Sequence, residues 1–108
     1  MSQEQLAAIK SIVKRDGRVE DFNLKKIEDA IFQAAESVGG KDRNLANSLA
    51  VKVLEALQKK FKDKPTVDNV QDLVEKTLIE EGHARTAKAF ILFRHQKDQE
   101  REQRALII

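Results

Sequence analysis

The chain has 108 residues, enough for one domain with a single core, and it contains no cysteine, which excludes a disulfide framework and a thiolate zinc site. Its 20 basic and 18 acidic residues nearly balance, so no overall field draws it to nucleic acid or to a membrane, and any affinity for anions must be local. The longest apolar run, residues 89–93, is too short to cross a bilayer, and without an apolar signal core the chain is predicted to be soluble and cytoplasmic.

The first predicted element is a β-hairpin that follows a polar N-terminal tail, residues 1–10. Asp16 and Gly17 separate two short runs with β-branched residues, which predicts a hairpin closed by a two-residue type I′ turn. In the register that such a turn imposes, Glu20 lies opposite Val13.

Two helices are predicted to follow the hairpin. Asn23 is expected to cap the first, because apolar residues recur at three- and four-residue steps over residues 24–38. The glycine pair at 39–40 is expected to end this helix. Asp42 can cap the second helix, whose apolar positions lie within residues 45–61.

A proline and two further helices complete the pattern. Because the residue before a proline avoids the α region, residues 65–67 are predicted to be extended and to add a third strand to the hairpin. Asp68 and Gln71 resemble a capping box that opens the third helix. Its expected core positions are Val70, Leu73, Val74, Thr77 and Leu78. The fourth helix is expected to begin near Ala84, after Gly82, and to bury Ala87, Phe90, Ile91 and the stem of Arg94.

The apolar stripe disappears after Arg94. Residues 96–108 have mixed charge and then an apolar end, so they are predicted to form a charged helical connector. We expect this connector to be truncated, because its last apolar residues have no evident partner within the sequence.

The hairpin and the start of the first helix bring five cations close together: Lys14, Arg15, Arg18, Lys25 and Lys26. Arginine suits bidentate contact with phosphate and a helix start offers N–H groups, so this segment predicts a phosphate site. In the expected register Lys14 and Arg15 point to opposite faces of the hairpin. The alternative is that these cations are solvated edge charges and that Glu20 pairs with Arg15 or Arg18.

Several other kinds of site are excluded. The glycines, at positions 17, 39, 40 and 82, form neither a G-x-x-x-x-G-K-[ST] loop nor a G-x-G-x-x-G turn. No serine has a histidine nearby in a catalytic motif, and two histidines are too few for a metal site on their own. The basic run 59–64 lacks interleaved aromatic residues, so nucleic-acid binding is not expected.

Three segments have a joint resemblance to a known family. They are V-K-R-D-G-x-x-E-x-F-x-x-x-K-I from Val13, V-Q-D-L-V-E from Val70 and A-K-A-F-I-L-F-R from Ala87. In this order and spacing they resemble the ATP-cone, the allosteric module at the N-terminus of many ribonucleotide reductases and in their zinc-ribbon repressor. The residues after Arg94 are similar to the connector of the anaerobic, glycyl-radical class.

The resemblance implies an α+β, mainly α fold: a four-helix bundle capped by a small three-stranded mixed β-sheet, with the domain spanning residues 11–95. It also implies roles for single residues. Lys14, Arg15 and Lys26 would hold a triphosphate, and Glu20 and Asn23 would hydrogen-bond the adenine edge. The remaining implied contacts are Ile12, Phe22 and Ile27 as the walls around the base, Gln71 near the sugar, and His95 or Lys97 as a cation for phosphate.

The function implied is that of a non-catalytic regulatory domain, which binds ATP or dATP with Mg²⁺ on the phosphates and controls the catalytic domain of a ribonucleotide reductase. Its readout would be self-association or contact with the catalytic domain. Two alternatives stay open. The chain could be the effector half of a repressor without its zinc ribbon, although no Cys-x-x-Cys pair precedes Val13, or it could be a helical interaction module without a ligand.

Overall fold

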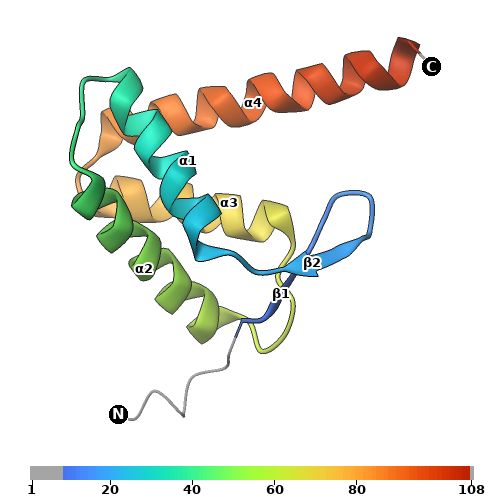
Figure 1. Ribbon diagram of the computed structural model, residues 1–108, viewed down its shortest axis with the longest axis horizontal. Helices are drawn as coiled ribbons and strands as arrows, with labels where there is room; N and C mark the ends of the chain where they lie inside the picture. The colour runs from blue at the N-terminus through green and yellow to red at the C-terminus, as the bar shows by residue number, and fades with distance from the viewer. Residues whose placement is uncertain (1–8, 108) are drawn as a thin grey trace.

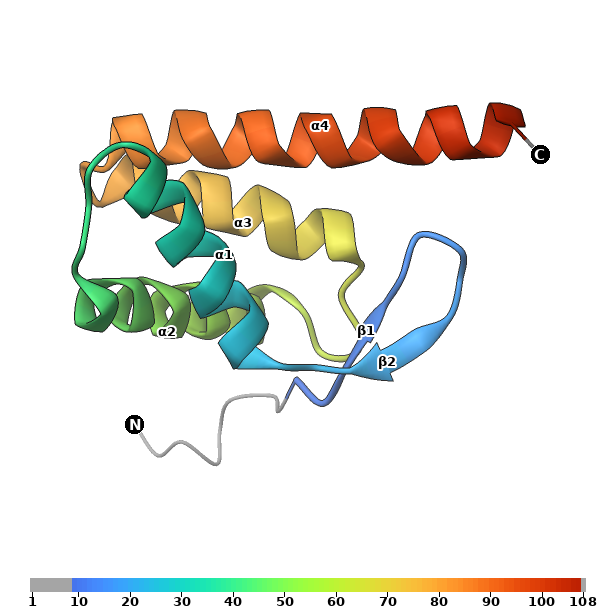
Figure 2. The same cartoon turned by 45° about the horizontal axis from the view of Figure 1, so that its top comes forward.

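The structure, a computed structural model, describes residues 9–107 and consists of a β-hairpin followed by four α-helices (Figure 1). The elements are β1 (Ser11–Val13), β2 (Val19–Asp21), α1 (Leu24–Ser37), α2 (Arg43–Lys60), α3 (Val67–Glu80) and α4 (Ala84–Ile107). Helices α1 and α3 each pack against both α2 and α4, so the core lies among the four helices. The hairpin lies at one end, beside the starts of α1 and α3 (Figures 1 and 2). The mainly helical prediction is confirmed.

The predicted tail falls largely on residues 1–8, which lie outside the described residues. Ile9 is part of the core, with 8% of its surface exposed. The carbonyl of Lys10 accepts a hydrogen bond from the Phe22 amide at 2.9 Å. Residues 9 and 10 of the predicted tail therefore contact the domain just ahead of β1.

The hairpin turn is one residue longer than predicted. The amide of Lys14 donates to the Arg18 carbonyl at 2.7 Å, so the loop consists of residues 15–17. Gly17 has a φ of 89° but Asp16 does not have a positive φ, whereas a type I′ turn needs positive φ at both central residues. Consequently Val13 pairs with Val19 and Ile12 pairs with Glu20, and the predicted pairing of Glu20 with Val13 is wrong.

The predicted third strand is reduced to a single contact. The sheet of the described residues has two antiparallel strands, and the segment after the proline adds one parallel bridge, between Val13 and Thr66. Thr66 cannot continue as a strand because it caps α3: its hydroxyl accepts from the Asn69 amide at 3.0 Å, and the Asn69 side chain accepts from the Thr66 amide at 2.9 Å. The capping box predicted at Asp68 and Gln71 is therefore wrong, and both side chains project from the first turns of α3.

The other helix ends agree with the sequence predictions. The Asn23 side chain accepts from the Lys25 amide at 3.0 Å, and the Asp42 side chain accepts from the Leu45 amide at 2.9 Å. Gly39 and Gly82 follow α1 and α3 with φ values of 93° and 84°. These positive values are ones that glycine adopts without steric cost, which explains why the helices end there.

The buried faces of α3 and α4 were predicted with one error. All five expected core positions of α3 are buried: Val70, Leu73, Val74, Thr77 and Leu78. On α4, Ala87 and Phe90 are buried as expected, but Ile91 is 42% exposed. Because each residue turns the helix by about 100°, Ile91 points away from the face that Phe90 presents to the core.

One buried charge was not foreseen. Glu28 on α1 is largely buried, and its carboxylate accepts from Asn47 Nδ2 at 2.7 Å and pairs with Arg43 Nε at 2.7 Å and Lys25 Nζ at 3.2 Å. The hydrogen bond from Asn47, followed by that from Lys25, lowers the pKa of Glu28 below its ordinary value. This carboxylate ties α1 to α2.

No helix in the described part of the chain combines the length and apolar character needed to cross a membrane.

Candidate functional site

A cleft of about 260 Å³ opens where the hairpin meets α1, α3 and α4. Its lining residues are Ile12, Lys14, Glu20, Asp21, Phe22, Asn23, Lys26, Ile27, Ala30, Val67, Val70, Gln71, Val74, Phe90, Lys97 and Arg101. Of the site residues predicted from the sequence, all line this cleft except Arg15 and His95. The fold thus gathers side chains from β1, β2 and three helices around one space.

One part of the cleft is apolar. Ile12 and Phe22 are half-buried and Ile27 is buried, and all three come from the hairpin and the first turns of α1. Three further apolar lining residues on α3 and α4, Val70, Val74 and Phe90, were predicted only as core residues. They belong to both, because the cleft ends on the surface of the core. An apolar slot of this kind can take a flat, uncharged ring.

Two polar groups stand beside this slot. Glu20 on β2 lies opposite Ile12, and its carboxylate is 3.8 Å from Lys14 Nζ. It therefore pairs with Lys14, not with Arg15 or Arg18. Asn23 caps α1 through Oδ1, which leaves its Nδ2 group as a hydrogen-bond donor next to the cleft.

The cations of the cleft come from both sides of it. Lys14 and Lys26 belong to the hairpin and α1, and Lys97 and Arg101 belong to α4. Arg101 was missed because it lies in the segment assigned to the connector. The signal that could have found it is spacing: residues four apart share one face of a helix, and Arg101 follows Lys97 by four.

A second cleft, of about 270 Å³, adjoins the first at the hairpin turn. Its lining residues are Lys14, Arg15, Asp16, Arg18, Val67 and Arg101. Lys14, Val67 and Arg101 line both clefts. The single carboxylate, Asp16, is already paired with Arg18 Nε at 2.7 Å, and a hydrogen bond from the Arg18 amide lowers its pKa. Cations thus outnumber carboxylates among the residues that line the second cleft.

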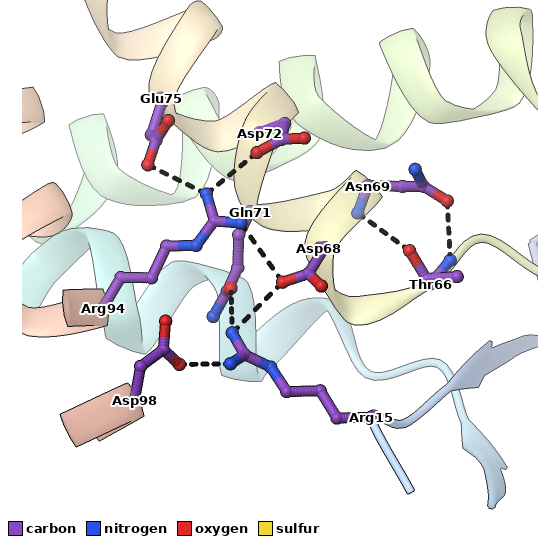
Figure 3. Close-up of polar contacts among 9 residues, drawn as sticks. All are labelled: Arg15, Thr66, Asp68, Asn69, Gln71, Asp72, Glu75, Arg94 and Asp98. Carbon is purple, nitrogen blue, oxygen red and sulfur yellow. Dashed lines mark hydrogen bonds and ion pairs between the residues drawn. The ribbon is translucent and has the colours of Figure 1, made fainter. Parts of the chain in front are cut away.

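Arg15 links the hairpin turn to two helices (Figure 3). Its guanidinium pairs with Asp98 on α4, lies 3.1 Å from Asp68 on α3 and donates to Gln71 Oε1 at 3.2 Å. Because Arg15 lies in the three-residue loop, strand alternation does not fix its direction, and it can reach α3 and α4. The predicted register would have pointed Lys14 and Arg15 to opposite faces of the hairpin. In the structure both residues line the second cleft.

Arg94 organises the carboxylates next to Arg15. It donates to Asp72 at 2.9 Å, to Glu75 at 3.0 Å and to Asp68 at 3.2 Å, so that Asp68 is shared between Arg94 and Arg15 (Figure 3). Burial lowers the pKa of Arg94, but the three carboxylates outweigh burial and hold that pKa above its ordinary value. The sequence had suggested only that the alkyl stem of Arg94 is buried.

His95 lies outside both clefts. Its ring is exposed, and Nε2 is 3.2 Å from Nε2 of Gln99, one turn later on α4. Of the two cations expected from this part of α4, Lys97 lines the cleft and His95 does not.

Comparison with known proteins identifies the family. The profile of the ATP cone domain matches residues 10–99. The chain is 39% identical over 104 residues to the vitamin B12-dependent ribonucleoside-diphosphate reductase of Thermoplasma acidophilum, and 31% identical over 93 residues to the anaerobic ribonucleoside-triphosphate reductase of Escherichia coli. These matches cover 92% and 86% of the chain, and 13% of each reductase.

The match to the family profile includes the hairpin, all of α1 to α3 and most of α4. The relatives include the anaerobic class that the connector resembles, together with vitamin B12-dependent reductases. The predicted family and regulatory role are confirmed by these matches. The chain therefore belongs to the ATP cone domain family, the nucleotide-binding regulatory modules of ribonucleotide reductases.

Proposed function

We propose that this domain binds ATP or dATP in the cleft, with Mg²⁺ on the phosphates, and thereby controls the catalytic domain of a ribonucleotide reductase. The observation that carries the proposal is the composition of two adjoining clefts that share Lys14, Val67 and Arg101. An apolar slot bordered by Glu20 and Asn23 leads to a region lined by several cations. A purine ring followed by a polyphosphate matches this order, because a flat ring would lie in the apolar slot and the negative phosphates would lie among the cations.

The polar pair beside the slot favours adenine over guanine. The Glu20 carboxylate can accept a hydrogen bond from the 6-amino group of adenine, and the Asn23 Nδ2 group can donate to N1. Guanine presents a carbonyl at position 6 and an N–H at position 1, which would set oxygen against carboxylate and donor against donor. We assign Ile12, Phe22 and Ile27 to the two faces of the base, and Gln71 to the sugar.

The phosphates are assigned to Lys14, Lys26 and Arg15, and Lys97 is the proposed cation from α4. In the described structure Arg15 is paired with Asp68 and Asp98, so a phosphate must replace these carboxylates. The exchange would remove the direct ion pairs from the hairpin turn to α3 and α4. A ligand shifts an equilibrium only through different affinities for its states, so we infer that these ion pairs differ between the nucleotide-bound and nucleotide-free domain.

The partner would be the catalytic part of the enzyme or a second cone. The two relatives named above are ribonucleotide reductases, and the chain spans about 13% of the length of each. We propose that ATP and dATP favour different arrangements of α4, and that these arrangements alter contacts with the catalytic domain or between cones.

Replacement of the phosphate cations tests the assignment. Calorimetric titration of Lys14→Ala and Lys26→Ala with ATP and dATP should show affinities reduced more than tenfold. The physical reason is that a charge-assisted hydrogen bond contributes about 1.5–3 kcal/mol, and each 1.4 kcal/mol is about tenfold in affinity.

Lys41→Ala is the matched control, because this exposed lysine lines neither cleft, and its affinity should stay at the wild-type value. If both cleft variants bind as tightly as the wild type, the phosphates lie elsewhere. If the wild type releases no heat with either nucleotide, the helical interaction module without a ligand is the better account.

A further inference from the structure

We propose that Arg101 of α4 is a direct ligand of the nucleotide polyphosphate, so that the last turns of α4 close the site opposite the hairpin. This inference rests on the proposed function and extends it to a part of the chain beyond the matched residues 10–99. The carrying observation is that Arg101 lines both clefts, as Lys14 does.

The shared position of Arg101 makes the inference independent of the exact phosphate path. If the polyphosphate stays in the first cleft, it lies among Lys14, Lys26, Lys97 and Arg101. If it extends into the second cleft, it lies among Lys14, Arg15, Arg18 and Arg101. Arg101 faces the anion in both cases, as Lys14 does from the opposite side.

The electrostatic surroundings also favour an anion at this place. Among the described residues, Arg101 makes no ion pair or hydrogen bond to a carboxylate, whereas Arg15, Arg18 and Arg94 are all paired. Asp98 lies three residues before Arg101 on α4, but it is engaged by Arg15. A guanidinium near other cations and without an anionic partner is stabilised by a multivalent anion, which it can bind in bidentate fashion.

The arrangement has a mechanical consequence. The hairpin supplies Lys14 and Arg15, and α4 supplies Lys97 and Arg101, so a bound polyphosphate would hold the hairpin turn against the second half of α4 (Figure 2). In the described structure the Arg15–Asp98 pair makes the same connection without a ligand. The polyphosphate would therefore replace the single Arg15–Asp98 pair between the hairpin and α4 by contacts with several cations of both elements.

The test compares Arg101→Gln with Arg104→Gln. Arg104 is exposed, lies one turn further along α4, and lines neither cleft, so it controls for the loss of one positive charge. Both variants and the wild type would be titrated with ATP and with adenosine. Protein-detected NMR is used because it can measure weak binding. We expect Arg101→Gln to lower the affinity for ATP more than tenfold and to leave the affinity for adenosine unchanged. Arg101→Lys should regain part of the lost ATP affinity, and Arg104→Gln should bind both ligands as the wild type does.

Any other outcome would contradict the proposed role of Arg101. If the wild type binds ATP and Arg101→Gln binds it equally well, the role of Arg101 is refuted while the proposed function stands. If Arg101→Gln loses as much affinity for adenosine as for ATP, Arg101 merely supports the fold. If Arg101→Gln and Arg104→Gln lose the same affinity for ATP, the loss is a general effect of charge. No binding of ATP by the wild type would overturn the proposed function and this inference with it.

Discussion

Replacement of Arg94 by methionine is expected to destabilise the domain by about 2–3 kcal/mol, the range for losing hydrogen bonds to charged groups at a partly buried site. The side chain of Arg94 is 18% exposed and holds three carboxylates of α3, those of Asp68, Asp72 and Glu75. Methionine keeps much of the packing but leaves these carboxylates facing one another. The free energy of unfolding in urea measures the effect.

Two further variants make the Arg94 prediction specific. Arg85→Met removes a positive charge from the exposed first turn of α4, and it should change the free energy of unfolding by less than about 0.5 kcal/mol. Asp72→Asn, added to Arg94→Met, should restore part of the lost stability because it relieves repulsion among the remaining carboxylates. A loss in Arg94→Met no larger than that in Arg85→Met would contradict the role assigned to Arg94.

Truncation of Leu78 to alanine should have the largest effect of any change discussed, about 3 kcal/mol within the usual range for buried leucines. Leu78 has no exposed surface and lies on the same face of α3 as Val74, which lines the first cleft. The loss combines the transfer of apolar surface with the cavity left behind. For a domain with a typical total stability of about 5–15 kcal/mol, this is a large fraction.

The neighbouring residue supplies the control for Leu78. Ile79 is 57% exposed, and Ile79→Ala removes side-chain carbon atoms of the same helix without creating a cavity. We expect a change below about 1 kcal/mol, as is usual for surface substitutions. Thermal unfolding followed by circular dichroism compares the two variants, and similar midpoints would show that α3 does not pack as described.

Much of the fold could be predicted because its determinants are local. The caps at Asn23 and Asp42 and the glycines that end α1 and α3 act within a few residues, so the sequence pattern identifies them. The start of α3 was misplaced for a related reason. Asp68 and Gln71 have the spacing of a capping box, but the box that forms joins Thr66 and Asn69 and lets Thr66 make its bridge to Val13.

The errors in the site arise from long-range contacts. Whether Asp-Gly forms a two-residue or a three-residue hairpin loop depends on how the strands meet the rest of the domain, and the longer loop places Arg15 beside α3 and α4. Arg101 was overlooked because the apolar stripe of α4 ends well before it, and only the direction of that helix past the hairpin brings it into the cleft. The loop length leaves no local trace in the sequence, and the four-residue spacing from Lys97 to Arg101 identifies a shared helix face but not the cleft that this face meets.

The most direct test of the central claim is an NMR titration of the isotope-labelled chain with ATP. We predict that saturating ATP shifts the amide signals of residues 12–27 together with those of Gln71, Lys97 and Arg101, with smaller shifts for GTP at the same concentration. Signals of the exposed face of α2, such as Lys52 and Glu55, should stay unchanged. An absence of shifts, or shifts confined to the groove around Arg85 and Leu92 at the other end of the domain, would contradict the account.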